Sequence, residues 1–280
     1  MLWIKKNVSK IIAFSSLLIM AFFWIVPVLY TIFSSFKTTA EINVSGSKLL
    51  PTHWVVSNYV KVLTNFDNAP IARWFLNSLF MSTVQTILVL IICSAAAYAY
   101  SRLRFKGREV IFWVLMSTMM FPSIINLIPL YKILSFLDWI DTPLAVIIPG
   151  SVGVFNIFLI KQFMTSIPMD FDESARIDGA SNFQIYAKII LPLIRPVLTI
   201  VALFTFTGSW NDFLWPSIVF NNIENLPLTP ALLLFQGMFV TDFGRLTTSA
   251  VIAIIPTLIL YLFAQKYFLE GLNLSSGVKG

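Results

Sequence analysis

The sequence contains very little of the chemistry that most enzyme active sites use. Its 280 residues include one histidine, His53, and one cysteine, Cys93. A single histidine excludes a metal site with paired histidine ligands and leaves little for a Ser/His pair, and a single cysteine excludes a disulfide within the chain. We interpret His53 as a solvated loop residue, and a ligand role comes second. No G-x-x-x-x-G-K-[ST] segment is present, so the chain does not bind ATP through that phosphate-binding loop.

Charged residues are also scarce. They make up 11% of the chain, against 58% hydrophobic residues, and the mean hydropathy is +0.83. This composition excludes an ordinary soluble globular protein, and the repeated uncharged runs indicate an integral membrane protein. The net charge of +6 does not require a nucleic-acid partner, because the basic residues lie at the ends of the apolar runs. We therefore predict an all-α integral membrane fold with one domain over residues 1–280.

Six apolar runs predict six transmembrane helices. The first is long enough to span a membrane, unlike the shorter core of a signal peptide, so we expect it to be retained. Residues 226–240 are apolar too, but Pro227, Pro230 and Gly237 favour a loop or re-entrant turn over a seventh span. The predicted spans are residues 11–36, 74–101, 110–131, 142–160, 196–220 and 246–265.

The distribution of Lys and Arg predicts the orientation. With six spans, the N-terminus, residues 102–108, the interval 161–195 and the tail 266–279 share one side and carry most of the basic residues. The basic residues of the opposite side are Lys37, Lys48, Lys61, Arg73, Lys132 and Arg245. By the positive-inside rule, both termini and the 161–195 interval are cytoplasmic. A seventh span would move only the tail to the outside.

The longest polar interval after the opening loop is predicted to form two short helices. Asp170 and Glu173 fit an N-cap with its capping-box partner, and Asp172 adds negative charge at the positive end of the helix dipole. Gly179 can end this helix with a positive φ at no steric cost. Ser181 then opens a second helix.

Ser181 and Gln184 form a second capping box, and we expect the helix to run to Leu191, before Pro192 and Pro196. The apolar residues predicted to share one face of this helix are Phe183, Tyr186, Ala187 and Ile190. A helix–Gly–helix segment with an apolar face outside the membrane is a docking surface. The alternative is a helix pair that rests on the lipid surface.

This interval resembles the E-A-A---D-G-A---------I-x-L-P signature of ABC importer permeases, with Ser174 in place of an Ala and Tyr186 where Phe is commoner. The matching residues are Glu173, Ala175, Asp178, Gly179, Ala180, Ile189, Leu191, Pro192 and Pro196. In that family the segment, here about residues 164–195, is a coupling loop that inserts into a cleft of the ATPase subunit. The resemblance assigns this contact to Glu173, Ser174, Ala175, Asp178, Gly179, Ala180, Phe183 and Tyr186.

The resemblance extends across almost the whole chain. The segments AYSRLRFKGR, FPSIINLIPLY, SIPMDFDESARIDGAS, GSWNDFLWP and the GVKG tail look like the second pore subunit of maltose-type sugar permeases. This implies a type I ABC importer permease fold in the cytoplasmic membrane, moving a di- or oligosaccharide by alternating access. It also implies a second permease subunit, two ATP-binding subunits and an extracytoplasmic solute-binding protein. This chain would hold no cofactor and would not be an enzyme, because ATP and Mg would bind to the partner ATPase.

Candidate contacts for the solute lie in spans three to five and in one loop. The candidate pathway residues are Asn126, Asn156, Trp210, Asn211 and Asp212. Asn126 could equally make an interhelical hydrogen bond. Asp212 lies about 24 Å beyond Pro196 along a helix, near the far interface, so an interfacial role and a substrate contact both stay open. By the resemblance, the loop Leu226–Gly244 would reach toward the binding protein's ligand through Gln236, Gly237, Asp242 and Gly244.

Two other functions stay open. One is a permease for a different solute, such as a polyol, a sugar phosphate or an amino acid. A phosphate-bearing solute would favour cationic residues within the spans, and the uncharged spans argue against it. The other is an intramembrane enzyme or receptor. An enzyme needs paired carboxylates, a nucleophile–base pair or metal ligands within the spans, and Asp212 alone does not meet that need.

Overall fold

The computed structural model describes residues 2–44, 48–64, 70–236 and 241–276, with side chains described from residue 10 to residue 266 of these ranges. The described residues are mostly helical, and their only β pairing is an isolated bridge between Gln236 and Thr241. The chain divides into two units. Unit 1 comprises Met1–Ala72 and Leu232–Ile255, and unit 2 comprises Arg73–Ala231 and Pro256–Gly280.

Unit 1 contains the long first helix and the start of the last one. Residues 10–25 of α1 are all exposed, and most of them are hydrophobic, whereas the end of the helix at Ser34 is buried. Such a surface is suited to lipid or to another membrane subunit. The helices of this unit are α1 (Leu2–Ser34), α2 (Thr39–Val44), α3 (Ser57–Thr64), η6 (Leu232–Phe235) and the first part of α15 (Phe243–Ser276).

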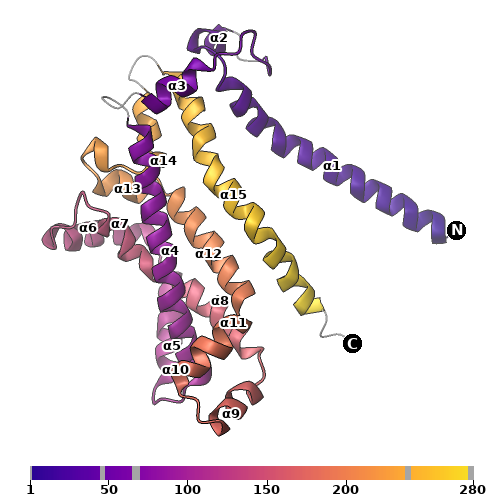
Figure 1. The fold of residues 1–280 in the computed structure, drawn as a ribbon, viewed down its shortest axis with the longest axis vertical. Helices are drawn as coiled ribbons and strands as arrows, with labels where there is room; N and C mark the ends of the chain where they lie inside the picture. The colour runs from indigo at the N-terminus through magenta and orange to yellow at the C-terminus, as the bar shows by residue number, and fades with distance from the viewer. Residues whose placement is uncertain (1, 45–47, 65–69, 237–240, 277–280) are drawn as a thin grey trace. The chain divides into compact units, whose positions relative to one another are not determined.

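Unit 2 holds most of the other helices, and α4 runs along its length (Figure 1). In this unit α9 and α10 lie at one end, and α13 and α14 lie toward the other (Figure 1). Its elements, with the short 3-10 and π turns labelled η, are α4 (Ile71–Arg102), α5 (Arg108–Ser117), η1 (Thr118–Met120), η2 (Ser123–Asn126), α6 (Leu127–Phe136), α7 (Leu144–Ile147), η3 (Pro149–Ser151), α8 (Val154–Thr165), α9 (Asp170–Ile177), α10 (Asn182–Ile185), η4 (Tyr186–Ile190), α11 (Leu191–Leu193), α12 (Arg195–Trp210), α13 (Leu214–Val219), η5 (Ile223–Asn225) and α14 (Leu228–Ala231).

Four described helices are long and apolar enough to cross a membrane, and two bent helix pairs raise the number to six if each pair counts as one span. The four are Lys10–Ser34, Ile71–Arg102, Leu144–Thr165 and Phe243–Lys266. The fold is thus all-α, with six candidate spans by length and composition. Residues 226–236 form only the short elements α14 and η6, so this described stretch has no helix long enough for a seventh span.

The third predicted span is not one straight helix. Arg108–Met120 and Ser123–Phe136 meet at an angle of 94°. The bend falls at Pro122, and Phe121 before it has an extended backbone, with φ −82° and ψ 126°. The ring of a proline disfavours the helical conformation of the preceding residue, which explains why the helix stops there.

The fifth predicted span, residues 196–220, is also shorter than expected. Its helix α12 ends at Trp210, and the separate helix α13 follows from Leu214. Pro196 lies in the first turn of α12, where its missing N–H costs nothing. At this end α12 meets Asn182–Leu193 at 78°.

The main core of unit 2 joins the spans to the segment that follows α8. Buried Val89, Cys93 and Ala97 of α4 cluster with residues of α8 and α12. The small Ala97 allows the close helix approach that is favoured in lipid. The same cluster includes Ile185 and Ile190, so the second short helix packs directly on the spans.

Candidate functional site

The first short helix begins one residue earlier than a cap at Asp170 would require. Asp170 is the first residue of α9, and its N-cap is Met169, which has no capping side chain. The prediction of a capping box at Asp170 and Glu173 is wrong, because the backbone carbonyl of Met169 accepts the Asp172 and Glu173 N–H bonds at 2.9 and 3.0 Å. The acidic first turn still suits the positive end of the helix dipole.

Gly179 ends α9 as predicted. It has a φ of +80° and donates its N–H to the Arg176 carbonyl at 3.0 Å, while the Ala180 N–H bonds to the Ala175 carbonyl at 2.9 Å. These two bonds form a Schellman motif, which satisfies the last carbonyls of the helix. A Cβ built on Gly179 would have no atom within 4 Å, so the chain itself leaves this turn open.

The second capping box is confirmed. The Gln184 N–H donates to the Ser181 hydroxyl at 3.3 Å, and the Ser181 N–H donates to the Gln184 side-chain oxygen at 2.8 Å. An exposed hydrogen bond of 2.8 Å from Arg176 to the Asn182 side chain joins the two short helices. The angle between the helices is therefore fixed by hydrogen bonds on both sides of Gly179.

The predicted apolar face of the second helix is not a single surface. Phe183 is 74% exposed, whereas Ile190 is fully buried. The reason is η4, a π-helical turn over Tyr186–Ile190, which inserts extra backbone and shifts the register. Pro192 lies two residues after the end of this turn, and the wider turn relieves the clash between its ring and the carbonyl four residues earlier.

Tyr186 points toward the spans and not toward solvent. Its hydroxyl lies 2.7 Å from the Ser94 hydroxyl of α4, and its ring packs on Tyr98 with 5.2 Å between centroids. Tyr186 is thus half-buried and joins the segment to α4, so it is less available to a partner than the resemblance implies.

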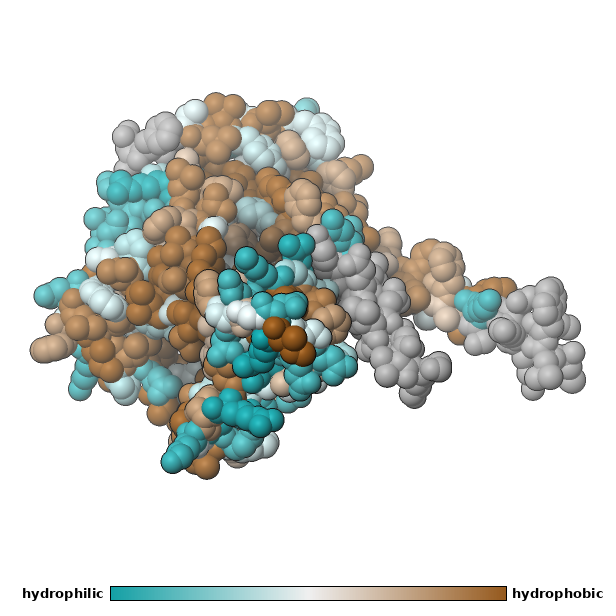
Figure 2. Space-filling view, turned by 60° about the horizontal axis from the view of Figure 1, so that its bottom comes forward, coloured by the Kyte–Doolittle hydropathy of each residue, from teal (hydrophilic) through white to brown (hydrophobic). Residues whose placement is uncertain are grey.

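The outer side of the segment offers a docking surface, which we call the coupling surface: α9, the Gly179 turn and Phe183. Ile177 and Phe183 project on either side of the turn with 87% and 74% of their areas exposed. Beside them lies an open groove of about 530 Å³, lined by Pro168, Asp170, Phe171, Ser174, Ala175, Asp178 and Ile189. Figure 2 turns this end of the molecule toward the viewer and shows hydrophilic residues gathered there, with hydrophobic atoms between them.

Five of the eight residues assigned to the coupling contact are exposed on this surface: Glu173, Ser174, Asp178, Gly179 and Phe183. Ala175 lines the groove but is largely buried, and Ala180 is half-buried. The structure therefore brings these residues together in one segment. Their contact with another subunit stays a prediction.

The candidate pathway residues occupy three different places in unit 2. Asn126 is exposed at the end of η2, and Asn156 is half-buried in the first turn of α8. Trp210 is 1% exposed, stacks on Phe206 and meets Phe75 edge to face. Trp210 therefore packs in the interior of the unit and does not face open space.

Asn211 and Asp212 follow the end of α12 and have local partners. The Asn211 amide donates to the Thr207 carbonyl at 2.9 Å. The Asp212 carboxylate lies beside the backbone N–H groups of Phe213, Leu214 and Trp215. Asp212 therefore stabilises the turn into α13, which is a local role that a substrate contact does not require.

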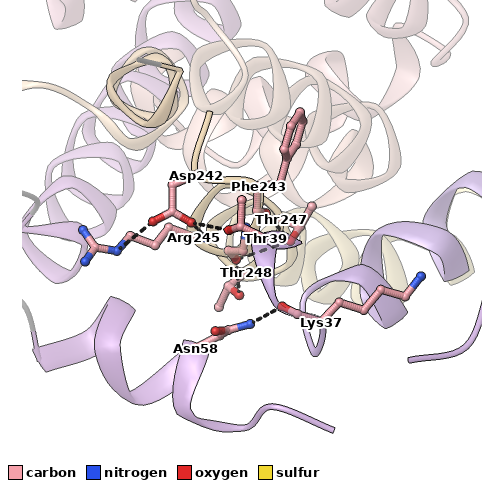
Figure 3. Close-up of polar contacts among 9 residues, drawn as sticks. Lys37, Thr39, Asn58, Asp242, Phe243, Arg245, Thr247 and Thr248 are labelled. Carbon is pink, nitrogen blue, oxygen red and sulfur yellow. Dashed lines mark hydrogen bonds and ion pairs between the residues drawn. The ribbon is translucent and has the colours of Figure 1, made fainter. Parts of the chain in front are cut away.

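The candidate binding-protein loop is described only in part, because Gly237 lies outside the described residues. Asp242 caps α15: its carboxylate accepts the Arg245 N–H at 3.1 Å, and it pairs with the Arg245 guanidinium at 3.2 Å. The Gly244 N–H donates to Thr39 at 3.2 Å (Figure 3). Asp242 and Gly244 thus form the base of the loop, whereas Gln236 is exposed beyond it.

Sequence reasoning missed one buried ion pair next to the coupling surface. From the sequence, Arg102 was used only as one of the basic residues that predict the cytoplasmic side, and Asp172 only as a negative charge at the helix dipole. In the structure the two side chains form a buried ion pair. The available signal was the spacing of Asp172 and Ala175, which puts both on one face of α9. Among the described residues, no three His, Cys, Asp or Glu side chains gather to hold a metal ion.

Comparison with known proteins gives consistent matches over nearly all of the chain. It is 33% identical to the arabinooligosaccharides transport system permease protein AraQ of Halalkalibacterium halodurans, over 93% of each chain. It is 30% identical to the galactooligosaccharides transport system permease protein GanQ of Bacillus subtilis, over 99% of this chain and 98% of that one.

A similar fold occurs in a solved structure, that of a bacterial ABC transporter involved in the import of the acidic polysaccharide alginate. The TM-score is 0.82 at 27% identity, over 94% of this chain and 97% of that one. Residues 94–272, which include the coupling surface, match the family described as binding-protein-dependent transport system inner membrane component. Because this match covers more than half of the chain, the protein belongs to the binding-protein-dependent transport system inner membrane components.

Proposed function

We propose that this chain is a pore-forming permease subunit of an ATP-driven importer that moves a di- or oligosaccharide across the cytoplasmic membrane by alternating access. The relatives named for arabinooligosaccharide and galactooligosaccharide transport support the solute class. The chain is a transporter subunit and not an enzyme.

The proposed assembly has a second permease, two ATP-binding subunits and an extracytoplasmic solute-binding protein. The exposed apolar surface over residues 10–25 of α1 supports contact with lipid and with the second permease. ATP and Mg bind to the partner ATPase, and no cofactor binds here. The excess of Lys and Arg near the coupling surface supports a cytoplasmic location for it and for both termini.

The coupling surface is the single observation that carries this proposal. Its turn is closed by the Schellman motif on one side and by the Ser181 capping box on the other. A rigid turn that exposes Ile177 and Phe183 beside a groove provides large apolar anchors of the kind that dominate protein interfaces. Glu173 and Asp178 can meet basic groups at the rim of an ATPase cleft.

The mechanism requires that ATP favour one global state. A ligand that binds two states equally shifts neither, so ATP must bind better to the closed ATPase dimer. Closure moves the coupling surfaces of the two permeases, and the permeases rock from inward-facing to outward-facing. The packing of Ile185 and Ile190 in the same cluster as α4, α8 and α12 gives the movement a direct route into the spans.

Two variants of the coupling surface test the function. Gly179→Val adds a bulky side chain at an open turn, and Glu173→Lys reverses an exposed charge. We expect complexes that lose their ATPase subunits or hydrolyse ATP without moving solute, while the spans still insert. Solute-stimulated ATPase activity and uptake are measured together in vesicles and normalised to assembled complex.

Gly107→Val is the matched control, because Gly107 has a φ of +81°, nearly that of Gly179, in a different loop. It carries the same backbone strain without touching the coupling surface. If both coupling variants keep wild-type uptake and ATPase activity, the coupling assignment is wrong.

The solute class is tested separately, by purifying the intact complex and identifying the solute held by its binding protein. A polyol, a sugar phosphate or an amino acid would overturn the sugar assignment.

A further inference from the structure

A buried ion pair joins the end of α4 to the first turn of α9. The Arg102 Nη1 and Asp172 Oδ2 atoms are 3.2 Å apart, and each side chain is only 2% exposed. In the three other ion pairs of the described residues, every side chain is at least 31% exposed. This pair therefore differs from ordinary surface ion pairs, which contribute little.

Arg102 also binds the end of α8. Its Nη2 atom donates to the Met164 carbonyl at 2.7 Å and to the Ile167 carbonyl at 2.8 Å. The guanidinium thus lies at the negative end of the α8 dipole, and Asp172 lies at the positive end of the α9 dipole. One planar, multi-donor group connects three helices, which a lysine could not do with its single ammonium.

The rest of α9 has little apolar contact with the spans. Only two of its residues are buried, Asp172 and Ala175, and alanine has a small side chain. Apolar burial therefore supplies little of the force that holds α9 in place. The ion pair, together with the hydrogen bond from Arg102 Nη1 to the sulfur of Met169, the N-cap residue of α9, is the main directional link between this helix and the membrane helices.

Stability alone does not account for such a pair. Removing two charges from water is costly, and a buried ion pair can often be replaced by apolar residues without loss of stability. Apolar contacts are not directional, so two helices that meet only through them can slide past each other. One guanidinium, with hydrogen bonds to the Met164 and Ile167 carbonyls and an ion pair with Asp172, fixes the register of three helices.

We propose that Arg102 and Asp172 are positioning residues that fasten α9 to the ends of α4 and α8, so that a movement imposed at the coupling surface passes into both helices as one rigid body. This inference rests on the proposed function for its transport consequence. Its structural part, the attachment of α9, does not.

The attachment of α9 is tested by hydrogen exchange of the assembled complex in lipid nanodiscs. In Asp172→Asn, we expect faster amide exchange over residues 170–178 and unchanged exchange in α12. Asp138→Asn is the matched control, because it makes the same change at an exposed carboxylate outside the coupling surface. Unchanged exchange of α9 in Asp172→Asn would overturn the proposal.

The transport consequence is tested by the amount of solute moved per ATP hydrolysed. We expect this ratio to fall by about tenfold in Asp172→Asn and to stay at the wild-type value in Asp138→Asn. Arg102→Lys should give an intermediate ratio, because it keeps the charge but loses the planar fork. A wild-type ratio in Asp172→Asn would overturn the proposal.

A double variant keeps the test valid if a lone buried charge prevents assembly. Arg102→Met with Asp172→Leu removes both charges and leaves apolar contact, so we expect assembled complexes that still exchange faster in α9 and remain uncoupled. If the double variant couples normally with slow exchange, the pair serves only charge balance and the proposal is wrong. If Gly179→Val and Glu173→Lys behave as wild type, the proposed function fails, and hydrogen exchange alone decides whether the pair positions α9.

Discussion

Thr39 donates a hydrogen bond to Asp242 across a separation of 203 residues, with 3.1 Å between the hydroxyl and the carboxylate oxygen. The same Asp242 oxygen accepts the Arg245 N–H and so caps α15. Nearby, the Asn58 amide donates to the backbone carbonyl of Lys37 (Figure 3). The Asn58 amide and the Thr248 hydroxyl also donate to the backbone carbonyl of Ser35. In unit 1, side-chain hydrogen bonds therefore tie the end of α1 to the start of α15.

Asp242→Ala should destabilise the protein. It removes an N-cap and one partner of Thr39, and the loss of an N-cap typically costs about 0.5–2 kcal/mol. We expect a lower midpoint in thermal unfolding of the purified complex. Asp242→Asn is the control, because asparagine caps helices as well as aspartate does. Equal losses in the two variants would contradict the capping role.

The orientation can be checked with single cysteines in a Cys93→Ser background. We expect Lys61→Cys to react with a membrane-impermeant maleimide from outside and Lys106→Cys to react only from inside, because the loop that contains Lys106 is the most basic of the short loops. Both positions are exposed on the chain, so a lack of reaction would report the membrane and not burial. The reverse labelling pattern would refute the orientation.

The chain purified without partners should not hydrolyse ATP. It lacks the glycine-rich phosphate loop, and the proposed nucleotide sites lie on other subunits. Phosphate release is measured across the elution profile of the chain. Turnover that follows this polypeptide would overturn the assignment, and activity that appears only when ATP-binding subunits are added supports it.

Trp210→Ala should reduce stability more than it alters solute preference. Trp210 is fully buried between Phe75 and Phe206, and truncating a buried aromatic residue costs about 3–5 kcal/mol. We expect a lower yield of folded complex, with an unchanged KM for the solute in the complex that remains. Phe204→Ala, on the exposed side of the same helix, should have little effect on yield. A changed KM with a normal yield would return Trp210 to the pathway.

Local chemistry was predictable from the sequence, and long-range contacts were not. The Gly179 turn and the Ser181–Gln184 capping box are decided by residues within a few positions of each other, and both are confirmed. The spacing of Asp170 and Glu173 also matched a capping box, but the N-cap residue of this helix is Met169. Two adjacent positions were acceptable, and tertiary packing selected one of them.

The ends of the spans were less predictable than their number. Hydropathy identified six apolar runs, but it does not report the direction in which each helix runs. The sharp bends at Pro122 and Ile194 were therefore not predicted. The pairing of Arg102 with Asp172 depends on how α4 and α9 pack, and nothing in either local sequence encodes the other. The inward position of Tyr186 has the same origin, because its partners Ser94 and Tyr98 belong to α4.

The wide turn at Tyr186–Ile190 has a consequence for how this segment tolerates changes in length. A π turn contains one residue more than the corresponding α turn, and each residue of an α-helix adds about 100° of rotation. Because the extra residue of a π turn is held within about one turn of the helix, deleting one residue there would restore a regular helix and leave Phe183 on nearly the same side relative to α12. Within this segment, alignments of relatives should therefore place single-residue gaps at the wide turn, where the exposed tip keeps its orientation.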